Sequence, residues 1–259
     1  MRFANFARVI APIAAIAMTA ALGGCNGTIS INGDEGKKLA DLDLSGPAPD
    51  ELVLASPDEI HVTQGDKLAI SVDGDPNTVA KLRFTLKHGE LGILREHGFK
   101  WSDGDKTAVV NVTMPALKEV TLAGSGKIVA PALARNAKVT IAGSGDVDAA
   151  SIDADKFDLT IAGSGNFHGA GNAGRFDLTV AGSGSSATDA LRVDSAKVTI
   201  AGSGDAAFAS DGDVEATIMG SGEVRVKGRA HCQVTSMGSG KLICEPGDGQ
   251  GVKNTKNKD

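Results

Sequence analysis

The sequence is poor in aromatic residues: its 259 residues include no tyrosine, one tryptophan and eight phenylalanines. Because aromatic side chains cannot fill much of the interior, the core must consist mainly of Val, Ile, Leu and Ala. Hydrophobic residues still make up 41% of the chain, which excludes a disordered protein. The 34 glycines exceed average usage, and together these features favour β-structure with many glycine turns over a helical bundle.

The sequence also lacks an excess of positive charge. Its 26 basic residues are outnumbered by 32 acidic ones, which gives a formal net charge of −6, and no basic stripe occurs. This balance argues against a nucleic acid partner. It also excludes electrostatic attachment to anionic lipid, so any link to a membrane has to be covalent or hydrophobic.

The first residues have the pattern of an export signal. Arg2 and Arg8 precede an apolar run from Val9 to Leu22, which is too short to span a membrane as a mature helix. The run ends in Leu22-Gly23-Gly24-Cys25, which resembles the bacterial lipobox. That resemblance implies that residues 1–24 are a signal peptide and that Cys25 becomes the lipidated first residue. The alternative is an ordinary signal peptide with an incidental cysteine.

Two polar segments flank the patterned part of the chain. Residues 26–50 are rich in Gly, Asp, Ser and Pro, so residues 25–51 are predicted to form a lipidated cysteine and a flexible tether. Residues 248–259 are predicted to be a polar tail. By resemblance to lipoprotein sorting in Gram-negative bacteria, Asn26 after the cysteine points to the outer membrane.

Residues 119–247 consist of a repeated sequence motif. Gly-Ser-Gly recurs seven times at intervals of 18 to 20 residues, each copy preceded three residues earlier by threonine and flanked by alternating apolar and polar residues. Such period-2 alternation predicts half-buried strands on both sides of a glycine corner, followed by a variable polar return. The corner glycines are Gly124, Gly126, Gly143, Gly145, Gly163, Gly165, Gly182, Gly184, Gly202, Gly204, Gly220, Gly222, Gly238 and Gly240.

One such repeat cannot bury its own apolar face, so the repeats must stack. Stacking in register places strands about 4.8 Å apart in parallel sheets. The sequence therefore predicts an all-β protein, a single-stranded parallel β-helix of about seven coils, with right-handed winding favoured. The threonines would form an outward ladder on one sheet. Residues 52–118 show strand alternation without the repeat and are predicted to be an N-terminal β cap that covers the first coil.

The order of motifs resembles a known family. A lipobox is followed by Glu59–Asp66, then by Val112–Leu117 leading into Val120–Gly126. This series is similar to the head GIN domain family of "putative auto-transporter adhesins" over residues 52–247. The resemblance implies a β-helical fold, a place at the cell surface or in the periplasm, and adhesion. The family has no catalytic residues to transfer to this chain.

Two cysteines remain besides Cys25. Cys232 and Cys244 lie six residues before and six after Gly238, and the alternation turns both inward. In an exported protein this arrangement predicts a disulfide bond. Metal binding is the alternative, but it would need further ligands.

Polar residues recur at one offset after the Gly-Ser-Gly corners. Asp146, Asn166, Asp205 and Glu223 could attract Ca²⁺ there, but Lys127, Ser185 and Lys241 occupy the same offset, which favours solvated corner residues. The acidic residues are dispersed and no histidine recurs beside a serine. No catalytic residue, metal or cofactor is therefore expected, and a polysaccharide-cleaving enzyme is only a remote alternative.

The candidate binding patch consists of His97, Phe99 and Trp101. Packing within the cap is the alternative role for these residues. The sequence thus leaves two hypotheses: an outer-membrane-anchored, non-enzymatic β-helix that binds envelope polysaccharide or envelope protein, and a passive structural scaffold.

Overall fold

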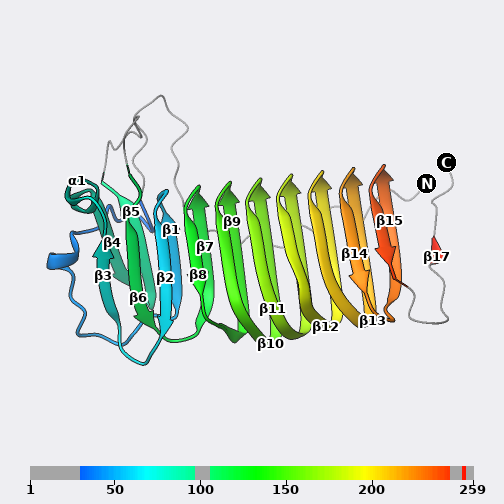
Figure 1. The fold of residues 1–259 in the computed structure, drawn as a ribbon, viewed down its shortest axis with the longest axis horizontal. Coiled ribbons are helices and arrows are strands. Elements are labelled where there is room, and N and C mark those ends of the chain that lie inside the picture. The colour runs from blue at the N-terminus through cyan, green and yellow to red at the C-terminus, as the bar shows by residue number, and fades with distance from the viewer. Residues whose placement is uncertain (1–29, 97–105, 246–252, 255–259) are drawn as a thin grey trace.

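The computed structural model describes residues 30–96, 106–245 and 253–254. These residues form a parallel β-solenoid of about seven turns, which confirms the predicted fold class (Figure 1). The repeat comprises β7 (Leu117–Gly124), β8 (Lys127–Ala130), β9 (Leu133–Gly143), β10 (Asp146–Gly163), β11 (Asn166–Gly182), β12 (Ser185–Gly202), β13 (Asp205–Gly220), β14 (Glu223–Lys227), β15 (His231–Gly238) and β16 (Lys241–Cys244), followed by the short β17 (Lys253–Asn254).

The interior of the solenoid is filled by the residues that alternate inward. Val139, Leu159, Leu178 and Val198 occupy equivalent places in successive coils and are at most 2% exposed. The few aromatic residues of the repeat gather in the same interior, where three pairs of rings lie with their centroids 5.3 to 5.6 Å apart: Phe157–Phe167, Phe157–Phe176 and Phe176–Phe208.

The Gly-Ser-Gly corners need both of their glycines. The first glycine of every copy has a φ between +123° and +133°, which side-chain-bearing residues rarely adopt. The second glycine lies against the coil below, because a Cβ on Gly145 would come 2.4 Å from the Gly126 oxygen. Backbone hydrogen bonds join the stacked corners, as where Ser144 N donates to Gly124 O at 2.9 Å. The corners thus fix the register from coil to coil.

The stretches between corners differ from the predicted polar returns. β10, β11, β12 and β13 run as unbroken strands of 16 to 18 residues from one corner to the next. Each bends where its register against the neighbouring coil shifts, as between Ala149 and Ile152. Parallel hydrogen bonding therefore continues around these bends, and small side chains leave room for it.

One coil carries polar residues where the others are apolar. Ser186 and Thr188 point inward and are at most 1% exposed. Thr188 Oγ1 donates a hydrogen bond to Ala207 O at 2.7 Å and lies 3.3 Å from Ser186 Oγ. This coil is the weakest match to the repeat, and its two hydroxyls satisfy each other and the adjacent backbone.

The N-terminal region extends the solenoid out of chain order. It contains η1 (Leu39–Asp41), β1 (Glu51–Ala55), β2 (Glu59–Gln64), β3 (Ala69–Asp73), α1 (Pro76–Ala80), β4 (Leu82–Lys87), β5 (Glu90–Arg95) and β6 (Val109–Met114). The coil of β1 and β2 pairs in parallel with β7 and β8 on one side and with β5 and β6 on the other. At the outer edge β3 pairs antiparallel with β6 and β4 pairs antiparallel with β5, and together with α1 these two strands cover this end of the solenoid (Figure 1).

A buried ion pair holds the corner between β1 and β2. Arg95 Nε donates to Asp58 Oδ2 at 2.7 Å, and the two side chains are at most 2% exposed. Ala108 N also donates to Asp58, at 2.7 Å, and Arg95 donates to Thr78 O in the middle of α1 at 3.3 Å. This network ties β1, β5, α1 and β6 together, and loss of one partner would leave a buried charge uncompensated.

The structure departs from the predicted tether over residues 31–42. Ile31 is 2% exposed and packs with Val53 and Leu94 on the outside of the first coils. Lys37 and Phe84 exchange two backbone hydrogen bonds of 2.8 and 2.7 Å. Apolar residues within a polar segment thus cover an outward-facing apolar patch, which the composition of residues 26–50 does not reveal.

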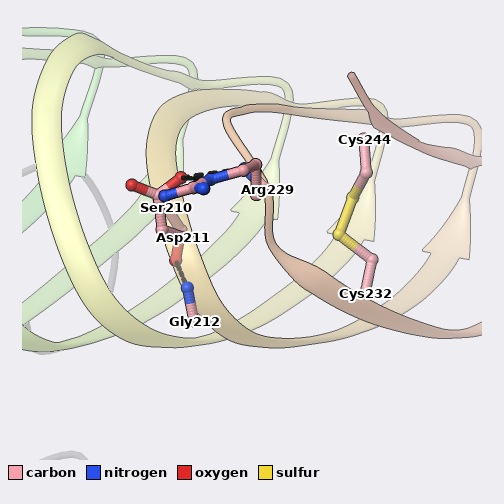
Figure 2. The surroundings of a disulfide bond; sticks show 6 residues. All are labelled: Ser210, Asp211, Gly212, Arg229, Cys232 and Cys244. Carbon is pink, nitrogen blue, oxygen red and sulfur yellow. Dashed lines mark hydrogen bonds and ion pairs between the residues drawn. A yellow bond between two sulfur atoms is a disulfide. The ribbon is translucent and has the colours of Figure 1, made fainter. Parts of the chain in front are cut away.

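The last coil is stapled by a disulfide bond. Cys232 in β15 and Cys244 in β16 are joined across the interior, with Cα atoms 6.7 Å apart (Figure 2). In the coil before it, Arg229 N donates to Asp211 Oδ1 at 2.9 Å, and Gly212 N donates to Ser210 Oγ at 3.1 Å. Within the segment predicted as a polar tail, β17 pairs with Gln233 and Val234 of β15.

The corner geometry predicts that Gly182→Ala is strongly destabilising. Gly182 has a φ of +129°, and a Cβ there would lie 2.3 Å from the Gly163 oxygen. We expect the free energy of unfolding of residues 26–259, measured with urea, to fall by at least about 2 kcal/mol. Gly46→Ala is the control, since nothing lies within 4 Å of that site, and a comparably small change at both positions would contradict the prediction.

Candidate functional site

The residues predicted to bind or to be modified fall partly outside the described structure. His97, Phe99 and Trp101, the predicted binding patch, and Cys25, the predicted lipidation site, lie outside the described residues. The corner glycines and the two remaining cysteines lie within the solenoid. A candidate site therefore has to come from the geometry of the described surface.

The most regular surface is the outer face of the sheet that precedes the Gly-Ser-Gly corners, here called the threonine face. Its central row consists of Thr140, Thr160, Thr179, Thr199, Thr217 and Thr235, each in register with the next. Thr121 continues the row toward the cap, but it is only 2% exposed. Neighbouring hydroxyls repeat at about 4.8 Å, and each can donate one hydrogen bond and accept others.

Charged side chains beside the first threonines are paired with one another. Lys138 Nζ lies 2.6 Å from Glu119, Lys156 Nζ lies 2.6 Å from Asp158, and Arg175 donates to Asp177 at 2.9 Å. Exposed pairs of this kind add at most about 1 kcal/mol each to stability. They leave the threonine face close to neutral over these coils.

Three carboxylates stack at the cap, in the row beside the threonines that also contains Lys138. Glu51 lies in register between Glu90 and Glu119. Burial raises the pKa of the Glu90 carboxyl, and the charges of Glu51 and Glu119 raise it further. Burial likewise raises the pKa of Glu51, with Glu119 and Asp50 adding to the effect. Ionised Glu51 is therefore unfavourable to the fold.

A polar groove opens at the other end of the threonine face, across β11, β12, β13 and β15. Its volume is about 430 Å³. Its polar lining residues are Arg175, Ser195, Lys197, Asp213, Glu215, His231 and Gln233. Arg175 is paired with Asp177, but within the described part of the chain the other four ionisable side chains have no oppositely charged partner within 4.0 Å. Lys197 and Glu215 are thus in register on neighbouring strands without forming an ion pair, whereas the upstream coils pair their charges.

A second groove of about 410 Å³ lies on the opposite sheet and is mostly apolar. Small residues form its floor, among them Ala150, Ala170 and Ala187. At its edge His168 Nδ1 lies 3.0 Å from Asp148 Oδ1. The groove is shallow and offers few hydrogen-bonding groups.

The polar residues after the corners bond within the protein. Asn166 Nδ2 donates to Asp146 Oδ1 at 2.9 Å, and Glu223 N donates to Asp205 Oδ1 at 3.0 Å. Among the described residues, no group of three or more His, Cys, Asp or Glu side chains is placed to hold a metal ion. Likewise, none of the helices in the described ranges has the length and apolar character needed to cross a membrane.

Sequence reasoning missed the polar groove, although a signal was present. When the repeats are aligned on their corners, the positions seven and five residues before the first glycine carry a basic and an acidic residue in two successive copies, Lys156 and Asp158 and then Arg175 and Asp177. At Ser195 and Lys197, and again at Asp213 and Glu215, this combination of opposite charges breaks down. The loss of opposite charges directly after these two copies was the signal in the sequence.

The chain was compared with known families and structures. A family model described as "Putative auto-transporter adhesin, head GIN domain" matches residues 48–230. A putative adhesin from Bacteroides fragilis has a similar structure, with a TM-score of 0.69, 21% identity, and coverage of 76% of this chain and 93% of its own. A putative lipid binding protein from Parabacteroides distasonis has a TM-score of 0.62, 24% identity and the same coverage. No curated protein matches.

The carboxylate row predicts a pH-dependent effect of Glu51→Gln. The pKa of Glu51 is higher in the folded state, so its ionisation opposes folding at neutral pH, and stability rises as the pH falls through that pKa. The variant should therefore have a higher Tm than the unmodified chain near neutral pH, and this advantage should vanish below about pH 3.5. Thermal unfolding across pH measures it.

The control is Glu215→Gln, which removes a carboxylate of the same row that is flanked by Lys197 and Gln233 instead of by acids. An equal gain in Tm in both variants, or a gain for Glu51→Gln that persists in acid, would show that carboxylate repulsion is not the cause.

Proposed function

This chain belongs to the head GIN domain family of putative auto-transporter adhesins, and from that premise we propose that it is a non-enzymatic envelope lipoprotein that binds a surface polymer through its threonine face. The proposed anchor is a lipid on Cys25 in the outer membrane. The proposed ligand is an envelope polysaccharide or an envelope protein.

The observation that carries this proposal is the in-register row of six threonines. A row of hydroxyls on a rigid parallel sheet offers the same hydrogen-bonding group at each coil. A polymer with repeating polar groups could make many weak contacts along such a row, and their combined strength would exceed that of any one contact. The acidic net charge of the chain is compatible with such a surface and unsuited to nucleic acid.

A passive scaffold of the envelope is the alternative. In that case the threonines would serve only the sheet, in which β-branched residues pack well. One structural neighbour is described as a putative lipid binding protein, so a lipid surface belongs among the ligands tested. A polysaccharide-cleaving enzyme would require grouped acids beside a cleft, and release of sugar from any glycan would overturn the proposal.

Binding should be tested with residues 26–259, which include all described residues. The screen covers envelope polysaccharides, envelope extract and lipid vesicles. We expect Thr160→Val, Thr179→Val and Thr199→Val combined to weaken polymer binding at least about tenfold, since valine keeps the β-branched shape but removes the hydroxyl. Affinity is measured by calorimetry or surface binding.

The matched control carries Asp148→Ala and His168→Ala, which remove exposed polar groups from the opposite sheet. Its affinity should stay within about twofold of the unmodified chain, a difference well below 1 kcal/mol. No binding of any polymer, or equal losses in the two variants, would favour the scaffold.

Lipidation of Cys25 is tested by palmitate labelling and membrane fractionation. We expect label in the outer-membrane fraction for the unmodified chain and none for Cys25→Ala, because the thioether requires that sulfur. The variant with both Cys232→Ser and Cys244→Ser keeps Cys25 and should keep the label. Unchanged labelling of Cys25→Ala would refute the anchor.

A further inference from the structure

The polar groove has a regular arrangement of side chains. Along one row, Ser195, Asp213 and His231 are in register on β12, β13 and β15. Along the next row toward the threonines, Lys197, Glu215 and Gln233 are in register on the same strands. Neighbours within a row lie about 4.8 Å apart along the solenoid, and the two rows are about 6.7 Å apart along the strands.

The charges in this arrangement are separated by strand. β12 contributes the ammonium of Lys197. β13 contributes the two carboxylates, Asp213 and Glu215, on the same outward face. β15 contributes the neutral amide of Gln233 and the imidazole of His231. One positive side chain therefore lies beside two negative ones, one strand spacing away.

The same rows upstream lack this separation. On β10 and β11, Lys156 and Arg175 are held by Asp158 and Asp177 within their own strands at 2.6 and 2.9 Å. Asp177, which neighbours Lys197 in register, is already neutralised by Arg175. Among the described residues, Lys197 and its in-register neighbour Glu215 form no ion pair, so Lys197 can contact an anion while Asp213 and Glu215 contact a cation.

We propose that this groove binds a zwitterionic group, in which a primary ammonium sits over Asp213 and Glu215 while an adjacent phosphate or carboxylate contacts Lys197. This inference rests on the proposed function, because it names the chemistry of the group recognised on the threonine face. Charge-assisted hydrogen bonds to both ends of the ligand give the site its specificity. Gln233 supplies an uncharged donor and acceptor at the rim.

A zwitterion fits better than a group of one charge. A simple anion would meet the two carboxylates beside Lys197, and a simple cation would leave Lys197 uncompensated. A neutral sugar could accept hydrogen bonds from Lys197 and Gln233, but it would gain nothing from the separation of charge. Such ligands occur as lipid headgroups and as substituents of envelope polymers, and both present the same two charges.

The probe is phosphoethanolamine, in which two methylene groups separate phosphate from ammonium, titrated into residues 26–259 and followed by NMR or calorimetry. Ethanolamine lacks the anion and glycerol phosphate lacks the ammonium. We expect saturable binding of phosphoethanolamine at least about tenfold tighter than that of either fragment, a factor that corresponds to one further charge-assisted contact.

Three variants separate the two halves of the site. Asp213→Asn and Glu215→Gln should each weaken the binding of phosphoethanolamine and of ethanolamine several-fold. Lys197→Gln should weaken the binding of phosphoethanolamine but not that of ethanolamine, because only the anion contacts Lys197. The matched controls Asp158→Asn and Lys156→Gln alter the equivalent positions two coils upstream of Lys197 and three coils upstream of Asp213 and Glu215, and they should change neither. Circular dichroism and Tm verify that each variant is folded.

Vesicles distinguish the source of the group. Binding to vesicles that contain phosphatidylethanolamine, but not to phosphatidylcholine vesicles, would support a lipid headgroup, whereas binding of the soluble probe alone would support a polymer substituent. The inference is overturned if phosphoethanolamine shows no saturable binding, if either fragment binds as tightly, or if the three groove variants match the controls.

The result of the phosphoethanolamine titration can be told apart from the result of the polymer screen. Loss of polymer binding in the threonine variant with unchanged binding of phosphoethanolamine would support the threonine face and the groove independently. Binding of the probe with no polymer bound by any variant would retain the groove and refute the polymer contact.

Discussion

The structure depends on the direct contact between stacked glycine corners. The oxygen of one corner accepts hydrogen bonds from the corner above it, as between Ser164 N and Gly143 O at 2.9 Å, and no Cβ fits between them. This contact resets the register at every corner, although the register shifts at the bends in between. Every row of side chains on the solenoid, inside and outside, follows from that alignment, because a strand displaced by one residue would turn its apolar face to solvent.

The two ends of the solenoid are covered in different ways. A parallel stack leaves unpaired backbone groups and exposed apolar residues at its last coils. At the N-terminal end, antiparallel β3 and β4 with α1 cover the stack, and the buried Asp58–Arg95 pair joins these elements to the first corner. At the C-terminal end the disulfide closes the last coil, where Met237 remains 61% exposed. In a chain-entropy description, closing a loop of this size contributes about 3 kcal/mol.

The outward side chains are free to serve a function because the corners already determine the fold. Threonines, charges and small residues can vary on the outside without altering the interior, and their spacing is set by the strands. Paired charges such as Lys138 and Glu119 make part of the face neutral, whereas in the groove at β12 to β15 Lys197 and Glu215 are neighbours that form no ion pair. On such a surface, the charged side chains that form no ion pair with a neighbour are the ones available to a ligand.

The sequence by itself determined the periodic part of this protein. The spacing of Gly-Ser-Gly and the alternation around it identified the coils, the inward residues and the threonine row, since each of these depends only on residues close in the chain. The order of the N-terminal coils, the packing of Ile31 against Val53 and Leu94, the Asp58–Arg95 pair and the groove at Lys197 and Asp213 were decided by the tertiary structure. Each joins residues from different strands or coils, and local alternation carries no information on which distant neighbours will meet or which charges will remain unpaired.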